Sequence, residues 1–225
     1  MRKKEYTFNF DYTTVKNYKL YEVAKRVLGP IFKILFKLEY KGLENIPKDK
    51  NTRYIVAINH TSNLDPIFVS IAKGIPTLHF MAKAEFFQNP FTRYVIEHLN
   101  GFPVKRGQGD NSAIEYGGKI IEEGHVMAIC PEGKRVKDKN GVPQKAKAGV
   151  AVIAKATNAS VLPVAIYCNG PMKVGKHITI SIGNLLSLSD MGLDKEETSP
   201  KDIKYGANLV MDNILKLWEA EKNAN

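Results

Sequence analysis

The chain has no apolar run long enough to cross a membrane. A transmembrane helix needs about 20 consecutive apolar residues, and the most apolar candidate, residues 18–40, is interrupted by cations such as Lys25 and Lys33. The first residues also lack the basic, apolar and small-residue order of a secretory signal. We therefore expect a cytoplasmic protein that does not span the bilayer.

Cysteine is scarce as well. Cys130 and Cys168 are the only two in 225 residues, and each falls in an apolar run typical of a strand. This pattern disfavours a disulfide framework or a zinc site. The histidines other than His60, at positions 79, 98, 125 and 177, show no paired ligand spacing with acidic neighbours. We predict that the protein binds no metal.

Acidic residues are too few to balance the basic ones. The 33 Lys and Arg against 23 Asp and Glu give a formal charge of +10, which favours nucleic acid, an anionic bilayer or a phosphorylated substrate as partner. No helix-turn-helix or RNA-binding aromatic platform is recognisable, so we predict no nucleic acid.

The segment 18–40 places apolar residues at helical spacing, with most of its cations off that stripe. Gly29-Pro30 should kink or split the helix. The segment can lie in the headgroup region of an anionic bilayer, or it can dock on the protein core as most amphipathic helices do. We divide the chain into a membrane-associating helical segment, 1–42, and a main domain, 43–225.

Beyond residue 47, short strand patterns alternate with helical ones. This alternation predicts an α/β fold with a largely parallel or mixed central sheet flanked by helices. The expected strands are 54–58, 77–81, 101–104, 126–130, 161–167 and 177–182, and the expected helices are 66–73, 90–98, 112–123, 147–157 and 201–222.

A His-x4-Asp pattern, His60 to Asp65, directly follows the first of these strands. Across a tight turn the carboxylate can reach the imidazole, fix its tautomer and leave the other ring nitrogen to take a proton from an alcohol. Asp65 can instead simply cap the helix that begins at Pro66. Ser62 lacks the Gly-x-Ser-x-Gly context of a nucleophile.

Cations and glycines follow two further strand patterns, where ligands bind in such folds, and a proline lies near the start of a third. Arg can grip a phosphate through two parallel hydrogen bonds, and Lys adds a point charge. The residues concerned are Lys105 and Arg106 after the strand 101–104, Glu132, Gly133, Lys134 and Arg135 after 126–130, and Pro163 near the start of 161–167.

In order and spacing these four segments resemble the glycerophospholipid acyltransferase family, whose central members are the bacterial 1-acyl-glycerol-3-phosphate acyltransferases. The resemblance covers roughly residues 40–185. Two residues depart from the family pattern: Lys134 replaces a usual Thr or Ser, and Cys130 a usual Phe. The matching blocks are 59–65, 101–106, 131–135 and 161–164, and Lys147 matches a basic Lys-x-Gly continuation.

The resemblance implies that residues 43–225 form an acyltransferase domain. His60 would act as general base and Asp65 would support it, without an acyl-enzyme. Lys105, Arg106 and Arg135 would hold the acceptor phosphate, with Lys134 and Lys147 as further cations. Glu132 would order its loop or bind a glycerol oxygen, while Gly133 and Pro163 would shape the site.

The implied reaction transfers an acyl group from acyl-CoA or an acyl carrier protein to the sn-2 hydroxyl of 1-acyl-glycerol-3-phosphate, lysophosphatidic acid, giving phosphatidic acid. No cofactor is implied, and the enzyme would sit peripherally on the inner face of the cell membrane. Glycerol-3-phosphate or a lysophospholipid remains an alternative acceptor. A non-catalytic basic membrane-binding module is the alternative from another class.

Overall fold

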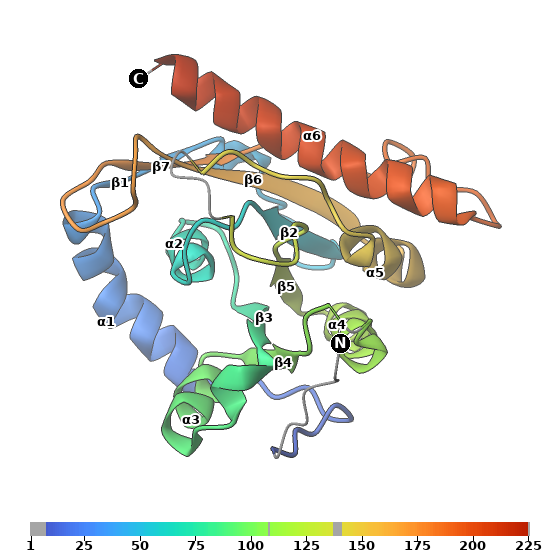
Figure 1. Cartoon of the computed structure of the whole chain (residues 1–225), viewed down its shortest axis with the longest axis horizontal. Coiled ribbons are helices and arrows are strands. Elements are labelled where there is room, and N and C mark those ends of the chain that lie inside the picture. Colours follow the sequence, from blue (N-terminus) through green and yellow to red (C-terminus); the bar gives the residue numbers. More distant parts are fainter. Residues whose placement is uncertain (1–7, 108, 137–140, 225) are drawn as a thin grey trace.

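A computed structural model describes residues 8–107, 109–136 and 141–224 of the chain (Figure 1). Residues 1–7 of the predicted membrane-associating segment therefore lie outside the described residues. Seven strands form one sheet: β1 Leu38–Lys41, β2 Tyr54–Ile58, β3 Leu78–Lys83, β4 Gly101–Val104, β5 Val126–Ile129, β6 Ser160–Cys168 and β7 Ile178–Ile182.

The sheet has the strand order β1-β7-β6-β2-β5-β3-β4. Every pairing is parallel except β6 with β7, which is antiparallel, so β1 and β7 run opposite to the other five strands. The predicted α/β fold with a mixed central sheet is confirmed.

Helices cover both faces of this sheet (Figure 1). One face packs against α4, α5 and α6, and the other against α1 and α2. The helices are α1 Lys19–Leu35, α2 Asp65–Ser70, α3 Pro90–His98, α4 Asn111–Glu122, α5 Gly149–Thr157 and α6 Pro200–Ala224, with short 3-10 helices η1 Leu43–Asn45 and η2 Ala84–Phe87.

Strand β2 lies in the middle of the sheet and is buried along its whole length. Ile55 and Ala57 belong to the core under α4, α5 and α6, whereas Val56 and Ile58 belong to the core under α1 and α2. A continuous apolar strand is what burial on two faces requires. Its carboxyl end is consequently held rigidly where His60 begins.

The segment 18–40 forms a helix followed by a strand, and the predicted split at Gly29-Pro30 does not occur. Helix α1 continues through Pro30 and is not split there. Gly29 is buried beside Ile71, which directly follows α2. The helix ends at Leu35, Lys37 takes a positive φ of 42°, and strand β1 follows. The boundary at residue 42 thus stays a prediction, although β1 already belongs to the sheet.

No helix among the described residues combines the length and the apolar character that a membrane crossing requires.

Candidate active site

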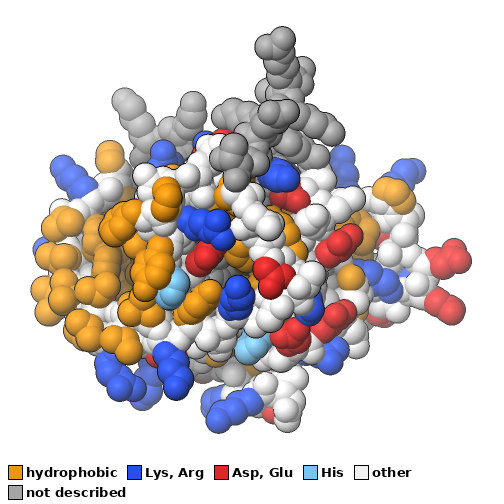
Figure 2. All heavy atoms as spheres, turned by 90° about the horizontal axis from the view of Figure 1, so that it is seen from below, with side chains coloured by type: hydrophobic (Ala, Val, Ile, Leu, Met, Phe, Trp, Pro, Cys, Tyr) orange, Lys and Arg blue, Asp and Glu red, His pale blue; other side chains and the backbone are white. Residues whose placement is uncertain are grey.

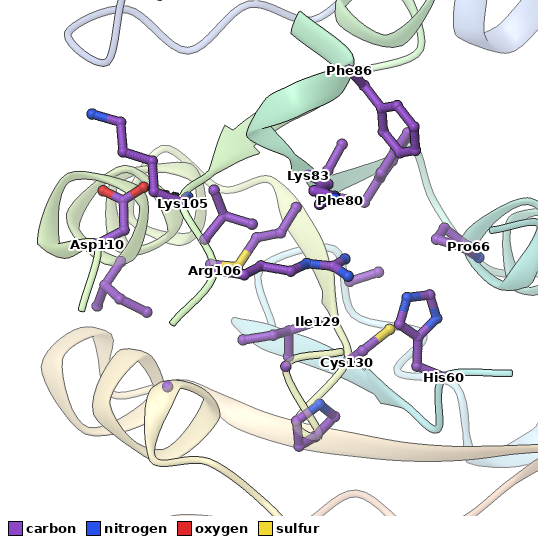
Figure 3. Close-up of a pocket in the computed structure, with 18 of the residues that line it drawn as sticks. His60, Pro66, Phe80, Lys83, Phe86, Lys105, Arg106, Asp110, Ile129 and Cys130 are labelled. Atoms are coloured by element: carbon purple, nitrogen blue, oxygen red, sulfur yellow. Dashed lines mark hydrogen bonds between the residues drawn. The ribbon is translucent and has the colours of Figure 1, made fainter. Parts of the chain in front are cut away.

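The candidate site lies at the carboxyl ends of β2, β5 and β4. These strands run in the same direction, so the segments that follow them meet at one edge of the sheet. His60 follows β2, Cys130 follows β5, and Arg106 follows β4; Figure 3 shows all three around one cavity.

His60 and Asp65 are in contact. The imidazole Nδ1 lies 2.9 Å from Asp65 Oδ2, and both side chains are buried or nearly so. Because Nδ1 faces a carboxylate, it carries the hydrogen of the neutral ring, and Nε2 is the nitrogen left to accept a proton. His60 itself lines the cavity.

Asp65 does not serve as the expected helix cap. Helix α2 begins at Asp65 with Leu64 before it, and no side chain caps its first turn. The carboxylate instead turns back to the preceding loop, where Oδ2 accepts from the amides of Thr61 and Ser62 at 2.8 Å each. Thr61 Oγ1 donates to Oδ1 at 3.1 Å. Hydrogen bonds from these donors offset the free-energy cost of burying the carboxylate fully, and they close the tight turn that brings Asp65 to His60.

Asn59 has a role that the sequence did not indicate. Its buried side chain donates to the carbonyl of Ile166 at 3.0 Å and accepts from the Ile166 amide at 2.7 Å. The side-chain amide thereby replaces the next main-chain pair of the β2–β6 ladder, and the backbone is free to turn away at His60. The sequence shows a polar residue directly after an apolar strand, but it does not indicate the partner, which lies 107 positions away.

Glu132 is buried and bound to the main chain of two other segments. Its carboxylate accepts from the amide of His60 at 2.7 Å and from the amide of Gln144 at 2.8 Å. Burial raises the pKa of Glu132 to about 7, although these two amide hydrogens act in the opposite direction. The carboxyl therefore titrates near neutral pH.

The cavity beside His60 has a volume of about 720 Å³ and is mostly apolar. Apolar side chains of β3, η2 and α3 form part of its wall, and His60 and the cations Lys83, Lys105, Arg106 and Lys147 also line it. The size and the combination of a mostly apolar lining with several cations suit an amphiphilic ligand. Members of the apolar wall include Phe80, Phe86, Phe91, Val95, Ile96 and Leu99.

Four of the predicted binding residues line this cavity: Lys105, Arg106, Gly133 and Lys147. Arg106 reaches into it toward His60, whereas Lys105 turns away from His60 (Figure 3). Gly133 has a positive φ of 69°, and a Cβ there would meet Lys147 Cδ at 2.7 Å. The glycine therefore lets the lysine stem pass closely over the loop that follows β5.

The structure places the other predicted binding residues elsewhere. Arg135 borders a separate hollow of about 300 Å³, together with Thr61 and Ser62 on the far side of the His60 loop. Lys134 is exposed and does not line the large cavity among the described residues. Pro163 is buried within β6 and faces Gly183. Direct substrate contacts of these three residues stay predictions.

Cys130 lies just beyond β5 and lines the cavity beside His60 (Figure 3). Its surroundings raise the pKa of the thiol well above the ordinary value, because desolvation and the nearby carboxylates of Asp65 and Glu132 disfavour a thiolate. A protonated thiol is a poor nucleophile.

Within the described ranges, no three His, Cys, Asp or Glu side chains gather as metal ligands would. The imidazole of His60, the carboxylate beside it and the nearby cations form a set suited to proton transfer at a bound anionic ligand.

Comparison with known families agrees with this geometry. A family model described as Acyltransferase matches residues 37–167, which include β1 to β5, the His60–Asp65 pair and most of β6.

Among curated proteins, the 1-acyl-sn-glycerol-3-phosphate acyltransferase of Bacillus subtilis is 28% identical over 65% of this chain and 70% of its own length. The protein of the same name from Streptococcus pneumoniae is 26% identical over 83% and 70%, respectively. The fold is similar to the crystal structure of the 1-acyl-sn-glycerophosphate acyltransferase PlsC from Thermotoga maritima, with a TM-score of 0.61 and 23% identity, covering 89% of this chain and 82% of that one.

Proposed function

Because this chain belongs to the acyltransferase family, we propose that it transfers a fatty acyl group from an acyl thioester to the sn-2 hydroxyl of 1-acyl-sn-glycerol-3-phosphate. The product is phosphatidic acid. The observation that carries the proposal is the contact of His60 with Asp65 beside a large, mostly apolar cavity. The names of the bacterial relatives support this acceptor.

In the proposed reaction, His60 Nε2 takes the proton of the acceptor hydroxyl as that oxygen attacks the thioester carbonyl. A C–O bond forms, the C–S bond breaks, and the imidazolium returns its proton to the leaving thiolate. Asp65, 2.9 Å from Nδ1, stabilises the imidazolium and fixes its orientation. The hydroxyl attacks directly, so no acyl-enzyme forms.

Arg106 and Lys147 are the proposed partners of the acceptor phosphate. Both line the cavity, and Arg106 reaches toward His60 (Figure 3). A guanidinium binds a phosphate through two parallel hydrogen bonds. The ammonium of a lysine, on a flexible stem, attracts the phosphate as a point charge. A phosphate bound there would leave the glycerol hydroxyl near the base.

The apolar wall formed by β3, η2 and α3 is the proposed place for an acyl chain. Phe86, Phe91 and Val95 line the cavity and are also partly or largely exposed on the surface. The cavity is therefore continuous with an apolar region of the surface, through which an insoluble lipid can enter without crossing water.

That region extends along α1 and is proposed to rest on a membrane. Apolar side chains gather at one side of the face shown in Figure 2, with Lys and Arg at its margin. Such an arrangement matches anionic headgroups around a shallow apolar insertion. We name this surface the apolar patch; its members are Leu20, Val23, Val27, Leu28, Ile31, Ile34 and Leu35 of α1, Phe86 of η2, and Phe91, Tyr94 and Val95 of α3.

The test is acyl transfer to 1-acyl-glycerol-3-phosphate in lipid vesicles, from a long-chain acyl-CoA and, in parallel, from an acyl carrier protein. We expect wild type to form phosphatidic acid and His60→Ala to lose at least about a hundredfold in kcat. His177→Ala is the matched control, because that histidine is exposed, pairs with Glu39 and lies outside the cavity.

Product from glycerol-3-phosphate or a lysophospholipid alone would reassign the acceptor. Turnover that survives His60→Ala would refute the mechanism. A folded protein that binds vesicles but turns over none of these acceptors with either donor would be a non-catalytic membrane-binding module.

A further inference from the structure

Glu132 directs both of its carboxylate oxygens at the protein's own backbone. The side chain is 4% exposed; Oε2 accepts from the amide of His60 and Oε1 from the amide of Gln144. The described residues that line the cavity include its neighbours Pro131 and Gly133 but not Glu132. The carboxylate is therefore placed to hold protein segments together, not to bind a glycerol oxygen.

We propose that Glu132 is a positioning residue, whose carboxylate holds the main chain of His60 against the segment 142–147 and thereby sets the place of the catalytic base. The inference rests on the proposed function for its kinetic consequence. The link itself is a property of the folded chain and can be measured without turnover.

The main chain of His60 is bound on both sides by the segment that follows β5. Its amide donates to Glu132 at 2.7 Å, and its carbonyl accepts from the amide of Val136 at 2.8 Å. Without the carboxylate, a buried amide hydrogen would lack an acceptor, and the loop would have to move to satisfy it. A displacement of about 1 Å at a reacting group can reduce the rate a hundredfold.

Lys147 has a separate connection to the same segment. Its amide donates to the carbonyl of Pro131 at 2.8 Å, and this bond does not involve Glu132. Loss of the carboxylate should therefore leave the cation near its place while the base shifts. We expect the change to act on kcat far more than on the KM for the acceptor.

The experiment compares wild type with Glu132→Gln at pH 8, above the pKa of about 7 at which this carboxyl titrates. Glutamine keeps the size but turns one acceptor into an NH₂ group that faces an amide hydrogen. Glu221→Gln is the matched control: Glu221 is also buried, at 6% exposure, but binds Lys41 and Ser181 and lies outside the cavity.

With 1-acyl-glycerol-3-phosphate in vesicles and acyl-CoA or acyl carrier protein as donor, Glu132→Gln should lower kcat at least tenfold while the KM for the acceptor changes less than threefold. Glu221→Gln should keep the wild-type kcat. A raised KM with unchanged kcat would show that Glu132 binds the acceptor, and an unchanged kcat and KM would show that it does not position the base; either result overturns the proposal.

Amide hydrogen exchange provides the readout that is independent of activity. Peptides containing the His60 and Gln144 amides should exchange faster in Glu132→Gln than in wild type, while a peptide from β7 should not change. Unchanged exchange at both amides overturns the proposal even if the protein is an acyltransferase. Faster exchange supports the link even if the chosen substrates give no product.

Discussion

Asn59 and Ile166 exchange two hydrogen bonds across the point where β2 ends, at 3.0 and 2.7 Å. A side-chain amide can replace a main-chain pair because it offers one donor and one acceptor in a plane. This substitution ends the ladder without leaving the Ile166 peptide unsatisfied in the core. The direction in which His60 leaves the sheet is therefore set from β6.

Replacing Asn59 with Asp keeps the size and one acceptor but removes the donor to the Ile166 carbonyl. We expect Asn59→Asp to lower the free energy of unfolding by about 2 kcal/mol or more at neutral pH. The introduced carboxyl is buried and faces a carbonyl, so its pKa should rise in the folded state, and the deficit should grow as pH rises from about 4 toward that value. Urea denaturation at several pH values measures both effects.

Asn45→Asp is the control for this change, because Asn45 donates a single bond, to the Ile182 carbonyl at 2.9 Å, from a half-buried position. An equal loss of stability in the two variants would contradict the special role of Asn59.

A second prediction concerns Asp65, whose four hydrogen-bond partners are all donors. Asp65→Asn puts an NH₂ group among them and can leave His60 in the wrong tautomer. We expect kcat to fall about 10²- to 10⁴-fold, together with a loss of about 1–3 kcal/mol in unfolding free energy. Asp202→Asn, which also alters a carboxylate that accepts from main-chain and side-chain donors, should cost stability alone. A wild-type kcat for Asp65→Asn would refute the supporting role.

The sequence predicted the sheet well because each strand is a short apolar run with a polar boundary. It missed β1, whose residues Leu38–Lys41 continue the apolar spacing of α1 without Gly or Pro between them. The chain turns from α1 into β1 at Lys37, which adopts a positive φ. Tertiary pairing with β7 fixes this strand, and a local pattern does not contain that information.

The contact between His60 and Asp65 was predictable because five residues across a turn limit how far apart they can lie. The links from Asn59 to Ile166 and from His60 to Glu132 span 107 and 72 residues and depend on which strands are neighbours. The place of Arg135 could not be predicted from the sequence either. It follows the turn at Gly133, which has a positive φ, and borders the hollow beside Thr61 and Ser62.

A third prediction separates the cations near the site. Arg106 reaches toward His60 in the cavity, whereas Lys134 is exposed outside it. Arg106→Ala should raise the KM for 1-acyl-glycerol-3-phosphate about 10- to 100-fold, since a hydrogen bond to a charged group is worth about 1.5–3 kcal/mol. Arg106→Lys should raise this KM less than Arg106→Ala does but still above the wild-type value, because an ammonium cannot form the two parallel hydrogen bonds of a guanidinium. A larger effect of Lys134→Ala would place the phosphate elsewhere.

A fourth prediction tests the apolar patch by vesicle flotation. The double variant Val27→Glu with Ile34→Glu should bind anionic vesicles at least about tenfold more weakly, which corresponds to about 1.4 kcal/mol. Val27 is 58% exposed, so this change does not disturb the core. Tyr205→Glu on α6 is the matched control, at 60% exposure and outside the patch. Equal binding of both variants and wild type would exclude the patch as the membrane contact.

The last prediction uses the titration of Glu132. Burial raises its pKa to about 7 in the folded chain, from an ordinary value of 4.5. As pH rises between these values, the unfolded chain loses the proton first, so the folded state binds more protons and its stability falls; above about pH 7 the effect is complete and constant. The stability of wild type relative to Glu132→Gln should accordingly decrease by up to about 1.4 kcal/mol per pH unit between pH 5 and 7.

Urea unfolding of wild type and Glu132→Gln at pH 5, 6, 7 and 8 measures this difference. A difference that instead increases with pH would mean that the amides of His60 and Gln144 stabilise the ionised carboxylate more than burial disfavours it. Ionisation of Glu132 at higher pH would then both stabilise the fold and strengthen the hydrogen bonds that position His60. The predicted fall of stability with pH means instead that ionisation of Glu132 costs folding free energy, although the ionised carboxylate is the form that best holds both amides. Functional sites commonly carry such local costs.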